Sequence, residues 1–540
     1  MRRPAWLAEL VKCGYLQSNG ADAVELLNGM ERGVRIDFVG DRSIRRDGPN
    51  LPITDVDVAK VDAVIKADVA AGKKAGPLAR PPCPWFVVSP IGAVPKKGSA
   101  KIRVIHHLSY PFDGDSVNAD VLAVKCELGR FADAARAVVR LGRGCHLVKL
   151  DVEAAYKQVS VHPDDWHLLG FKWQGHFYYE RVLPFGLKSS CRIWEWYATA
   201  LHRMFESMGI DCVIHYIDDF LFVIKSRTEA DGHLERALDL CRRLGIPMSA
   251  AKTEGPCTAL IFLGILLDTV AMTASLPAEK LAEIRRLAEV WASKSSATAK
   301  ELQSLAGTLA FACCVVRPGR FFIRSLFARA AQMKAAGADR HSAWSLTADV
   351  RADIAWWGTF APAWNGTSLL LEKEWTEAHR IEFFSDACGS GYGAHYGPHW
   401  FEARWTAQNR ADAMRAEQES MPYFEMYALV TAAMTWGHEW RGKKIMFRSD
   451  CMPVVYAVNG GSSPVPQIMH LLRELARSAC LHGYDFRCLH IPGEDNTIAD
   501  LLSRVGDCAA VQCHDLYRTL GKARDVSPTP RTEPTSPSLH

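Results

Sequence analysis

The chain has 540 residues, of which 48% are hydrophobic and 23% charged, ordinary values for a globular protein of about three or four domains. Its formal net charge of +4 is too small to indicate nucleic-acid binding by itself, so local clusters of charge are more informative. The longest apolar run, Ala259 to Leu267, is too short to cross a bilayer. Charged Glu9 and Lys12 interrupt the segment where a signal peptide would be apolar. We therefore expect an intracellular protein with no membrane partner and with its 16 cysteines reduced.

Predicted elements, taken in chain order, divide the chain into a series of segments. From Trp85 to Leu108, apolar and β-branched residues alternate with basic ones, which predicts strands and a hairpin. Strand-like and helix-like patterns alternate over 130–275, which is typical of a mixed α/β unit. Apolar residues at helical spacing predict helices over 278–293 and 298–314. The predicted organisation is an N-terminal extension at 1–75, a mixed α/β unit at 76–275, a helical region at 276–335, a Trp-rich connector at 336–378, a second α/β domain at 379–506, and a tail at 507–540 that is disordered because it has little apolar surface to bury.

Three acids in the first α/β unit lie at predicted strand ends. Leu147 to Asp151 is an apolar strand ending in a carboxylate, and Val213 to Val223 predicts a hairpin with Asp218 and Asp219 at its turn. An acid pair can mark a solvated turn, but acids inside an apolar hairpin are costly without a metal or solvent. Carboxylate oxygens suit Mg²⁺, and two ions about 3.5–4 Å apart stabilise both oxygens of an in-line displacement at phosphorus. We therefore expect Asp151, Asp218 and Asp219 to be catalytic and to bind two Mg²⁺ ions, with Mn²⁺ as a substitute.

Four acids in the second α/β domain form a comparable group. Asp386 and Asp450 each end a predicted strand, Glu425 lies in a predicted helix that continues to about Trp440, and Asp500 lies in a helix that opens near Asn496. Each acid alone is better explained as a solvated turn. Together they predict a second catalytic site with two Mg²⁺ ions, suited to hydrolysis of a phosphodiester.

The motifs around the first acid group resemble the reverse transcriptases of retroelements. Tyr216-Ile217-Asp218-Asp219 is similar to their third palm motif, Asp151 to Tyr156 to their first, and Leu183 to Ser190 to their second. The resemblance implies a right-hand polymerase, with fingers and palm in 76–275 and a thumb in 276–335. Such an enzyme copies an RNA template by extending a DNA primer with dNTPs.

The same resemblance assigns roles to residues that would bind the substrate. Tyr156 would crowd the sugar 2′ position and exclude ribonucleotides, and Phe185 would lie under the incoming nucleotide. Arg103 would grip the triphosphate, a task that suits a permanently charged fork of donors. Lys96 would assist, although neighbouring lysines compete for that role. Lys252 would protonate the leaving pyrophosphate.

The four downstream acids resemble the acidic positions of ribonuclease H, which cuts the RNA strand of an RNA–DNA hybrid. The fold class implied is an α/β (α+β) multidomain protein, with a right-hand polymerase followed by an RNase H-like α/β domain. One departure lies in the loop Pro492 to Asn496, which lacks the mobile His of the cellular enzymes, while His490 is expected on the preceding strand. Retrotransposon enzymes often share this shortened loop, so it is compatible with activity at a slower turnover.

Further motifs resemble those of DIRS-type retrotransposons, which encode a tyrosine recombinase. No Asp-Thr-Gly or Asp-Ser-Gly protease triplet and no His/Cys integrase motif occurs in the sequence. A truncated Ty3-like polyprotein would give the same pattern, so that alternative stays open. The motifs are His106 to Pro111, Asp115 to Asn118, Ala355 to Trp357, Trp364 to Gly366 and Ile498 to Arg504.

Two other functions fit parts of the sequence. A decayed or domesticated retroelement protein would bind nucleic acid without catalysis, although all seven acids are present. An RNA-dependent RNA polymerase could also carry an acid pair on a hairpin, but the ribonuclease-like domain argues against it. The oligomeric state is not indicated by the sequence.

Overall fold

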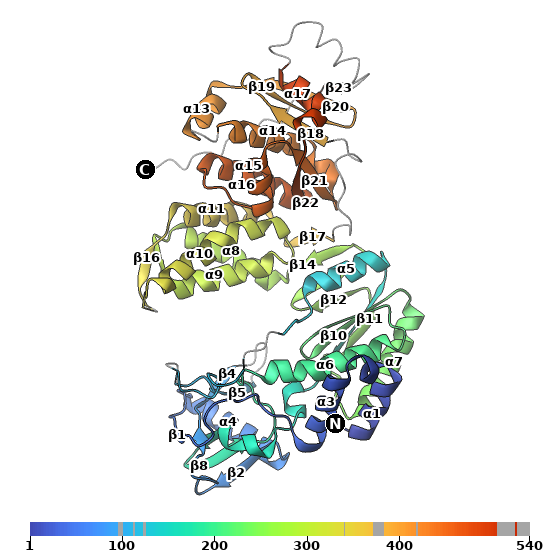
Figure 1. The fold of residues 1–540 in the computed structure, drawn as a ribbon, viewed down its shortest axis with the longest axis vertical. Coiled ribbons are helices and arrows are strands. Elements are labelled where there is room, and N and C mark those ends of the chain that lie inside the picture. Colours follow the sequence, from blue (N-terminus) through green and yellow to red (C-terminus); the bar gives the residue numbers. More distant parts are fainter. Residues whose placement is uncertain are drawn as a thin grey trace. The chain divides into compact units, whose positions relative to one another are not determined.

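The computed structural model describes residues 1–95, 101–111, 114–122, 126–339, 341–370, 383–416, 420–504 and 524–525. It divides into two compact units, Met1–Leu260 and Ile261–His540 (Figure 1). Among the described residues, no helix combines the length and the apolarity that a membrane crossing requires. The candidate Lys96 and most of the predicted tail lie outside the described residues. The predicted domain boundaries within each unit stay predictions.

The first unit is built on a four-stranded antiparallel sheet in the order β11-β6-β10-β9. Strands β6, β9 and β10 occupy the segments predicted from apolar runs, and their apolar side chains are largely buried. Helices α5, α6 and α7 pack against the sheet. The bounds are α5 Phe131–Leu141, β6 His146–Asp151, α6 Ser190–Glu206, β9 Cys212–Tyr216, β10 Asp219–Ile224, α7 Arg227–Leu244 and β11 Glu254–Cys257.

The N-terminal residues complete the core of this sheet. The helices α1 (Arg3–Lys12), α2 (Tyr15–Ser18) and α3 (Gly20–Arg32) contact one another, and α1 also contacts α6 and α7. Trp6 is fully buried and its indole Nε1 donates to the Leu244 carbonyl at 3.1 Å, at the end of α7. The first helices therefore belong to the same hydrophobic core as the acid-bearing sheet.

A second sheet in the first unit has the order β1-β3-β7-β8-β2, and a separate hairpin joins β4 to β5. The hairpin confirms the prediction for the segment after Trp85. Buried Lys74 binds Glu180 at 2.5 Å and Asp68 at 3.2 Å, and this network ties α4 to the sheet. The bounds are β1 Arg46–Asp47, α4 Asp55–Ala70, β2 Lys74–Leu78, β3 Val87–Val88, β4 Ile91–Pro95, β5 Ile102–His106, η1 Ala155–Gln158, η2 Pro163–Leu168, β7 Gly170–Trp173 and β8 His176–Glu180.

The second unit begins with a small sheet, whose first strand β12 spans the boundary after Leu260, and continues with a group of helices. The sheet has the order β12-β13-β14-β17, and Figure 1 shows α8, α9, α10 and α11 as neighbouring helices. Helices α8 and α9 confirm the two predicted from apolar spacing. The bounds are β12 Ala259–Phe262, β13 Ile265–Asp268, β14 Thr273–Ser275, α8 Ala278–Ala292, β15 Ser296–Thr298, α9 Ala299–Ala312, η3 Arg317–Ile323, α10 Arg324–Ala335, β16 Ala343–Ser345, α11 Ala348–Ala363 and β17 Thr367–Leu369.

The rest of the second unit is a mixed α/β domain. Strands β18, β19 and β20 are antiparallel, β21 and β22 are parallel, and β21 contacts β18. Helix α14 packs against β18 and α16, and α17 against β18 and β19. Within the predicted tail, Arg524–Asp525 form the short strand β23 beside β20. The bounds are β18 Phe383–Ala387, β19 Gly391–Tyr396, β20 His399–Arg404, α13 Ala407–Arg415, α14 Ser420–Trp436, η5 Gly437–Trp440, β21 Lys444–Ser449, α15 Met452–Gly460, α16 Pro466–His482, β22 Asp485–His490, η6 Gly493–Asp495 and α17 Thr497–Arg504.

Candidate active sites

Strand register brings the three acids of the first unit to one end of the sheet. Antiparallel β6 and β10 place Asp151 directly opposite Asp219, and Asp218 lies in the tight turn before β10. Ile217 in this turn has a φ of +56°, a left-handed conformation that is strained for a β-branched residue and is often found at functional sites. The turn is held by Trp194, whose indole Nε1 donates to the Ile217 carbonyl at 2.8 Å.

These carboxylates repel one another in a partly buried site. Asp151 is 4% exposed, and its Oδ2 accepts a hydrogen bond from Lys252 Nζ at 2.5 Å. Burial raises the pKa of Asp218, and the charge of Asp151 adds to the effect. Burial, followed by the charges of Asp218 and Asp151, raises the pKa of Asp219 to about 6. Excess negative charge on oxygen-only ligands fits a hard divalent cation such as Mg²⁺.

The predicted substrate-binding side chains lie close to this site and to one another. The Arg103 guanidinium carbon is 4.6 Å from the centre of the Phe185 ring, and the Phe185 and Tyr156 rings are 5.5 Å apart. Burial, with Cys191 and Asp218 nearby, raises the pKa of Tyr156, so its hydroxyl stays protonated. The structure thus groups Arg103, Phe185 and Tyr156, which come from separate segments of the sequence.

Asn118 is a functional candidate that the sequence alone did not single out. Its side-chain Oδ1 accepts from the Lys188 backbone N–H at 2.8 Å, and its Nδ2 donates to the Gly186 carbonyl and to Ser109 Oγ, both at 2.8 Å. These bonds fix the turn that follows Phe185. Asn118 belongs to a motif noted only for its resemblance to DIRS elements, and no local pattern in the sequence indicates its long-range partners.

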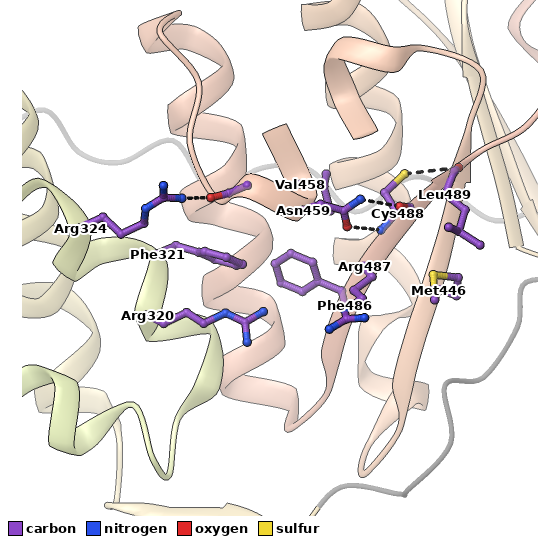
Figure 2. Close-up of a pocket in the computed structure, with 11 residues that line it drawn as sticks. Arg320, Phe321, Arg324, Met446, Val458, Asn459, Phe486, Arg487, Cys488 and Leu489 are labelled. Carbon is purple, nitrogen blue, oxygen red and sulfur yellow. Dashed lines mark hydrogen bonds between the residues drawn. The ribbon is translucent and has the colours of Figure 1, made fainter. Parts of the chain in front are cut away.

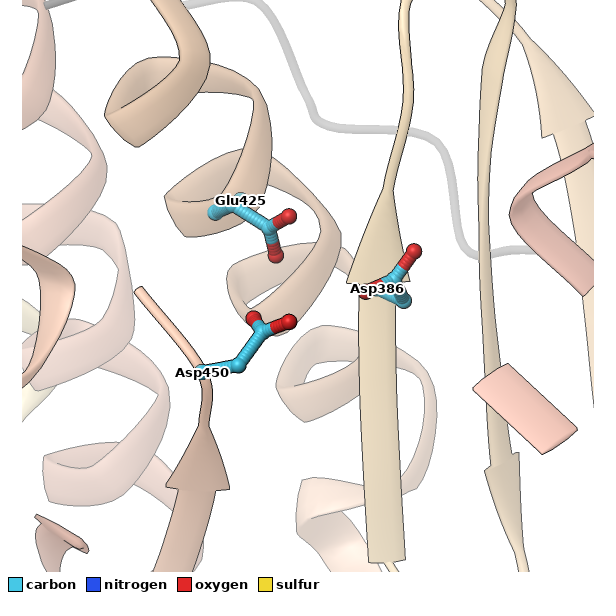
Figure 3. A group of neighbouring side chains, drawn as sticks. All are labelled: Asp386, Glu425 and Asp450. Atoms are coloured by element: carbon cyan, nitrogen blue, oxygen red, sulfur yellow. The ribbon is translucent and has the colours of Figure 1, made fainter. Parts of the chain in front are cut away.

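Three of the four downstream acids meet in the second unit. One ligand atom from each of Asp386, Glu425 and Asp450 lies within 4.8 Å of the others, and Figure 3 shows their carboxyl groups converging from β18, α14 and the end of β21. Among the described residues, no other group of three or more Asp, Glu, His or Cys side chains meets this distance. The three acids of the first unit are therefore less tightly grouped than this triad. Their oxygen ligands also fit Mg²⁺.

The environment of this triad favours protonation in the absence of a cation. Burial, with the charges of Asp450 and Asp500, raises the pKa of Asp386 to about 6. Burial, with Asp386 and Asp450, raises the pKa of Glu425 well above its ordinary value. Glu425 Oε1 also accepts the Ala387 backbone N–H at 3.3 Å. A bound cation would therefore compete with protons for these carboxylates.

Asp500 lies near the triad but outside it. It is on α17, and its Oδ1 accepts from Arg504 Nε at 2.7 Å. Asn496, which the sequence marks only as the start of a helix, donates from Nδ2 to Asp386 Oδ1 at 3.2 Å. His490 ends β22 as expected, and its Nε2 donates to the Asp450 carbonyl at 3.1 Å. This His therefore supports the backbone beside the triad.

Comparisons with known proteins agree with the first site. Residues 94–267 match the family model described as "Reverse transcriptase (RNA-dependent DNA polymerase)", so the chain contains a reverse transcriptase domain. The genome polyprotein of Petunia vein clearing virus (isolate Shepherd) is 25% identical over 117 residues, 22% of this chain and 5% of the polyprotein. The transposon Tf2-3 polyprotein of Schizosaccharomyces pombe is 23% identical over 125 residues, 23% of this chain and 9% of the polyprotein. The chain thus matches small parts of much longer viral and transposon polyproteins.

Solved structures extend the comparison to nearly the whole chain. A foamy viral protease–reverse transcriptase in complex with double-stranded DNA aligns with a TM-score of 0.51 at 15% identity, covering 88% of this chain and 80% of that one. A second structure of the foamy viral protein with double-stranded DNA has a TM-score of 0.50 at 14% identity, covering 88% and 94%. The fold class predicted from the sequence is confirmed: a mixed α/β multidomain protein with a right-hand polymerase and an RNase H-like domain.

Proposed function

We propose that this protein is the RNA-directed DNA polymerase of a retrotransposon and that its RNase H-like domain cleaves the RNA strand of RNA–DNA hybrids. The observation that carries the first part is the strand register that sets Asp151 opposite Asp219, with Asp218 in the adjoining turn. These acids lie inside the segment that matches the reverse transcriptase family. The double-stranded DNA bound by the foamy viral protein supports a nucleic-acid partner.

Each side chain of the polymerase site has a specific task in this proposal. Asp151, Asp218 and Asp219 would hold two Mg²⁺ ions, which supply charge stabilisation to the attacking and leaving oxygens. Arg103 binds the dNTP triphosphate, Phe185 lies under the nucleotide, and Tyr156 excludes a 2′-hydroxyl. The hydrogen bond and charge of Asp151 outweigh partial burial and raise the pKa of Lys252, so its Nζ holds a proton that can pass to pyrophosphate.

The RNase H-like site follows the same logic with hydrolysis as the reaction. Asp386, Glu425 and Asp450 would hold the Mg²⁺ ions, and Asp500 stays a candidate fourth ligand that would have to leave Arg504 to join them. Asn496 keeps one Asp386 oxygen oriented by its hydrogen bond. The convergence of three buried or half-buried acids is the observation that supports this second activity.

Primer extension tests the polymerase. The purified full chain should extend a DNA primer on an RNA template with dNTPs and Mg²⁺ or Mn²⁺, and Asp218→Asn/Asp219→Asn should abolish extension. Asp231→Asn, at an exposed acid of α7 paired with Arg227, is a control that should extend normally. Absence of extension by the wild-type protein with either metal would favour the alternative of a retroelement protein that binds nucleic acid without catalysis.

Hybrid cleavage tests the second site separately. A labelled RNA–DNA hybrid should be cut by the wild-type protein, and Asp450→Asn should stop cutting while primer extension continues. Loss of both activities in this one variant would contradict the assignment of two independent sites.

We also propose an element of the DIRS type and an intracellular location for the protein. The element type rests on the motifs around His106 and Asn118 and on those of α11 and α17. Sequencing the DNA that flanks the gene should find a reading frame for a tyrosine recombinase. A retroviral-type integrase frame there would instead indicate a Ty3-like element.

A further inference from the structure

An arginine-lined cavity lies within the second unit, between η3–α10 and the RNase H-like domain (Figure 2). Its volume is about 640 Å³, and the described residues that line it include Arg320, Arg324 and Arg487 but no acidic residue. The buried rings of Phe321 and Phe486 lie on its apolar side, with centres 5.8 Å apart. A cavity with concentrated positive charge and an apolar wall suits a phosphorylated ligand with sugar or base groups.

Close packing fixes the shape of this cavity. Arg324 donates to the carbonyl of Gly460 at the end of α15, where a guanidinium also complements the negative end of the helix dipole. A Cβ atom on Gly461 would come within 1.8 Å of the Phe321 ring, so this turn packs directly on η3. Asn459 bonds the edge of β22 twice, donating to the Cys488 carbonyl at 2.7 Å and accepting its N–H at 2.9 Å. The cavity is therefore part of the folded unit.

Part of the cavity lining lies on the sheet face that leads to a catalytic candidate, while Phe486 and Cys488 line the cavity from the opposite face. Side chains alternate along a strand, so Met446 and Arg448 of β21 share one face, and the same alternation continued past the strand end at Ser449 puts Asp450 on that face. Parallel pairing sets Met446 beside Arg487 and Arg448 beside Leu489. Arg487 and Leu489 of β22 therefore share the face of Asp450. From Arg487 to His490, which touches Asp450, the strand rises roughly 10 Å, or about three base steps of a duplex.

We propose that this cavity binds the phosphodiester backbone of a nucleic-acid strand whose scissile phosphate lies at the Asp386–Glu425–Asp450 triad. Arg320 and Arg487 contact the phosphates, because planar guanidinium groups match phosphate geometry. Arg324 donates its hydrogen bond to the Gly460 carbonyl and lines the cavity without contacting a phosphate. The Arg320 guanidinium carbon lies 4.9 Å from the centre of the Phe321 ring, which orients it. This inference rests on the proposed cleavage of RNA–DNA hybrids and adds a binding site to it.

Salt-dependent binding tests the proposal without any catalysis. Binding of a fluorescent RNA–DNA hybrid to the full chain is measured in EDTA over a series of salt concentrations. An arginine that neutralises one phosphate contributes about 0.9 to the slope of log affinity against log salt, so Arg320→Gln/Arg487→Gln should lower this slope by about 1–2 and weaken binding severalfold. Arg227→Gln/Arg242→Gln makes the same charge change at exposed arginines of α7 and should keep the wild-type slope. A wild-type slope in the cavity variant would overturn the proposal.

Site-specific crosslinking gives a second readout that does not depend on removing a charge. A photo-crosslinking amino acid replaces Leu489 at the cavity or, as a control, Leu481 on α16; the two side chains are similarly exposed, at 49% and 51%. The proposal expects strong crosslinking to the hybrid at Leu489 and little at Leu481, and equal or no crosslinking overturns it. Crosslinking at Leu489 by a protein that fails to cut hybrids would reject the proposed cleavage while retaining the binding site.

Discussion

Asp219→Asn is expected to stabilise the metal-free protein at alkaline pH. The pKa of Asp219 rises from 3.8 to about 6 on folding, so the folded protein binds this proton more tightly than the unfolded chain does. Stability therefore falls as the pH rises between these two values, and the decrease is complete above about pH 6. Two pKa units correspond to about 3 kcal/mol, which screening at a partly exposed group reduces to about 1–2 kcal/mol.

Calorimetry in EDTA measures this effect. At pH 8 the transition of the first unit should rise by roughly 3–6 °C in Asp219→Asn, whereas at pH 4.5 only about a third of the free-energy gain should remain. Mg²⁺ should stabilise the wild-type protein more than the variant, because it binds the folded state through this carboxylate. Asp231→Asn is the matched control and should keep the wild-type transition temperature at both pH values. A variant no more stable than the wild type at pH 8, or equally stabilised at both pH values, would refute the reasoning.

Three other substitutions probe the two sites. Asn118→Ala removes the side-chain bonds that fix the turn after Phe185, which we propose lies under the incoming nucleotide. Steady-state extension should then show a dNTP KM raised about tenfold, a cost of about 1.4 kcal/mol, with a smaller change in kcat. Trp194→Phe keeps a buried ring but removes the hydrogen-bond donor to the strained turn that carries the acids. If the loss of this bond costs about 1–2 kcal/mol of transition-state stabilisation, kcat should fall about 5–30-fold. Asp500→Asn should reduce hybrid cleavage less than Asp450→Asn does, because Asp500 lies outside the triad.

Matched variants separate these effects from general destabilisation. Ser109→Ala removes only one of the three side-chain hydrogen bonds of Asn118 and should raise the KM much less. A Trp194→Phe protein with wild-type kcat would show that its hydrogen bond does not position the acids. In both cases thermal melting should confirm that the variant remains folded at the assay temperature.

Much of the sequence-based prediction followed from short-range patterns that the fold preserves. Apolar runs that lead to an acid became β6, β18 and β21, because the apolar side chains pack into the core of the sheet and the acid falls at or next to the strand end. The acid pair between two apolar runs became the β9–β10 turn. Apolar spacing also placed α8 and α9 within a few residues. In each case the residues within one short segment were enough to predict the type and position of the element.

Contacts between distant residues could not be predicted in this way. Asn118 reaches Gly186 and Lys188 across about 70 residues, and Trp194 bonds Ile217 from a different element. Such pairs depend on how sheets and helices pack, which one sequence does not specify locally. The ion pair of Asp500 with Arg504 is different, because the i,i+4 spacing on a predicted helix was visible and favours that contact.

The charge balance of the RNase H-like site sharpens the prediction for Asp500. In the polymerase site Lys252 compensates Asp151 directly, whereas the cation that acts on Asp386 is Arg504, which is already bound to Asp500. Asp500→Asn would release Arg504 to pair with Asp386 and compete with Mg²⁺ there. Hybrid cleavage by Asp500→Asn should therefore recover in part at higher Mg²⁺ concentration, while cleavage by Asp450→Asn should not recover. If raising Mg²⁺ rescues neither variant, Asp500 acts as a ligand in its own right, and its distance from the triad must close when the substrate binds.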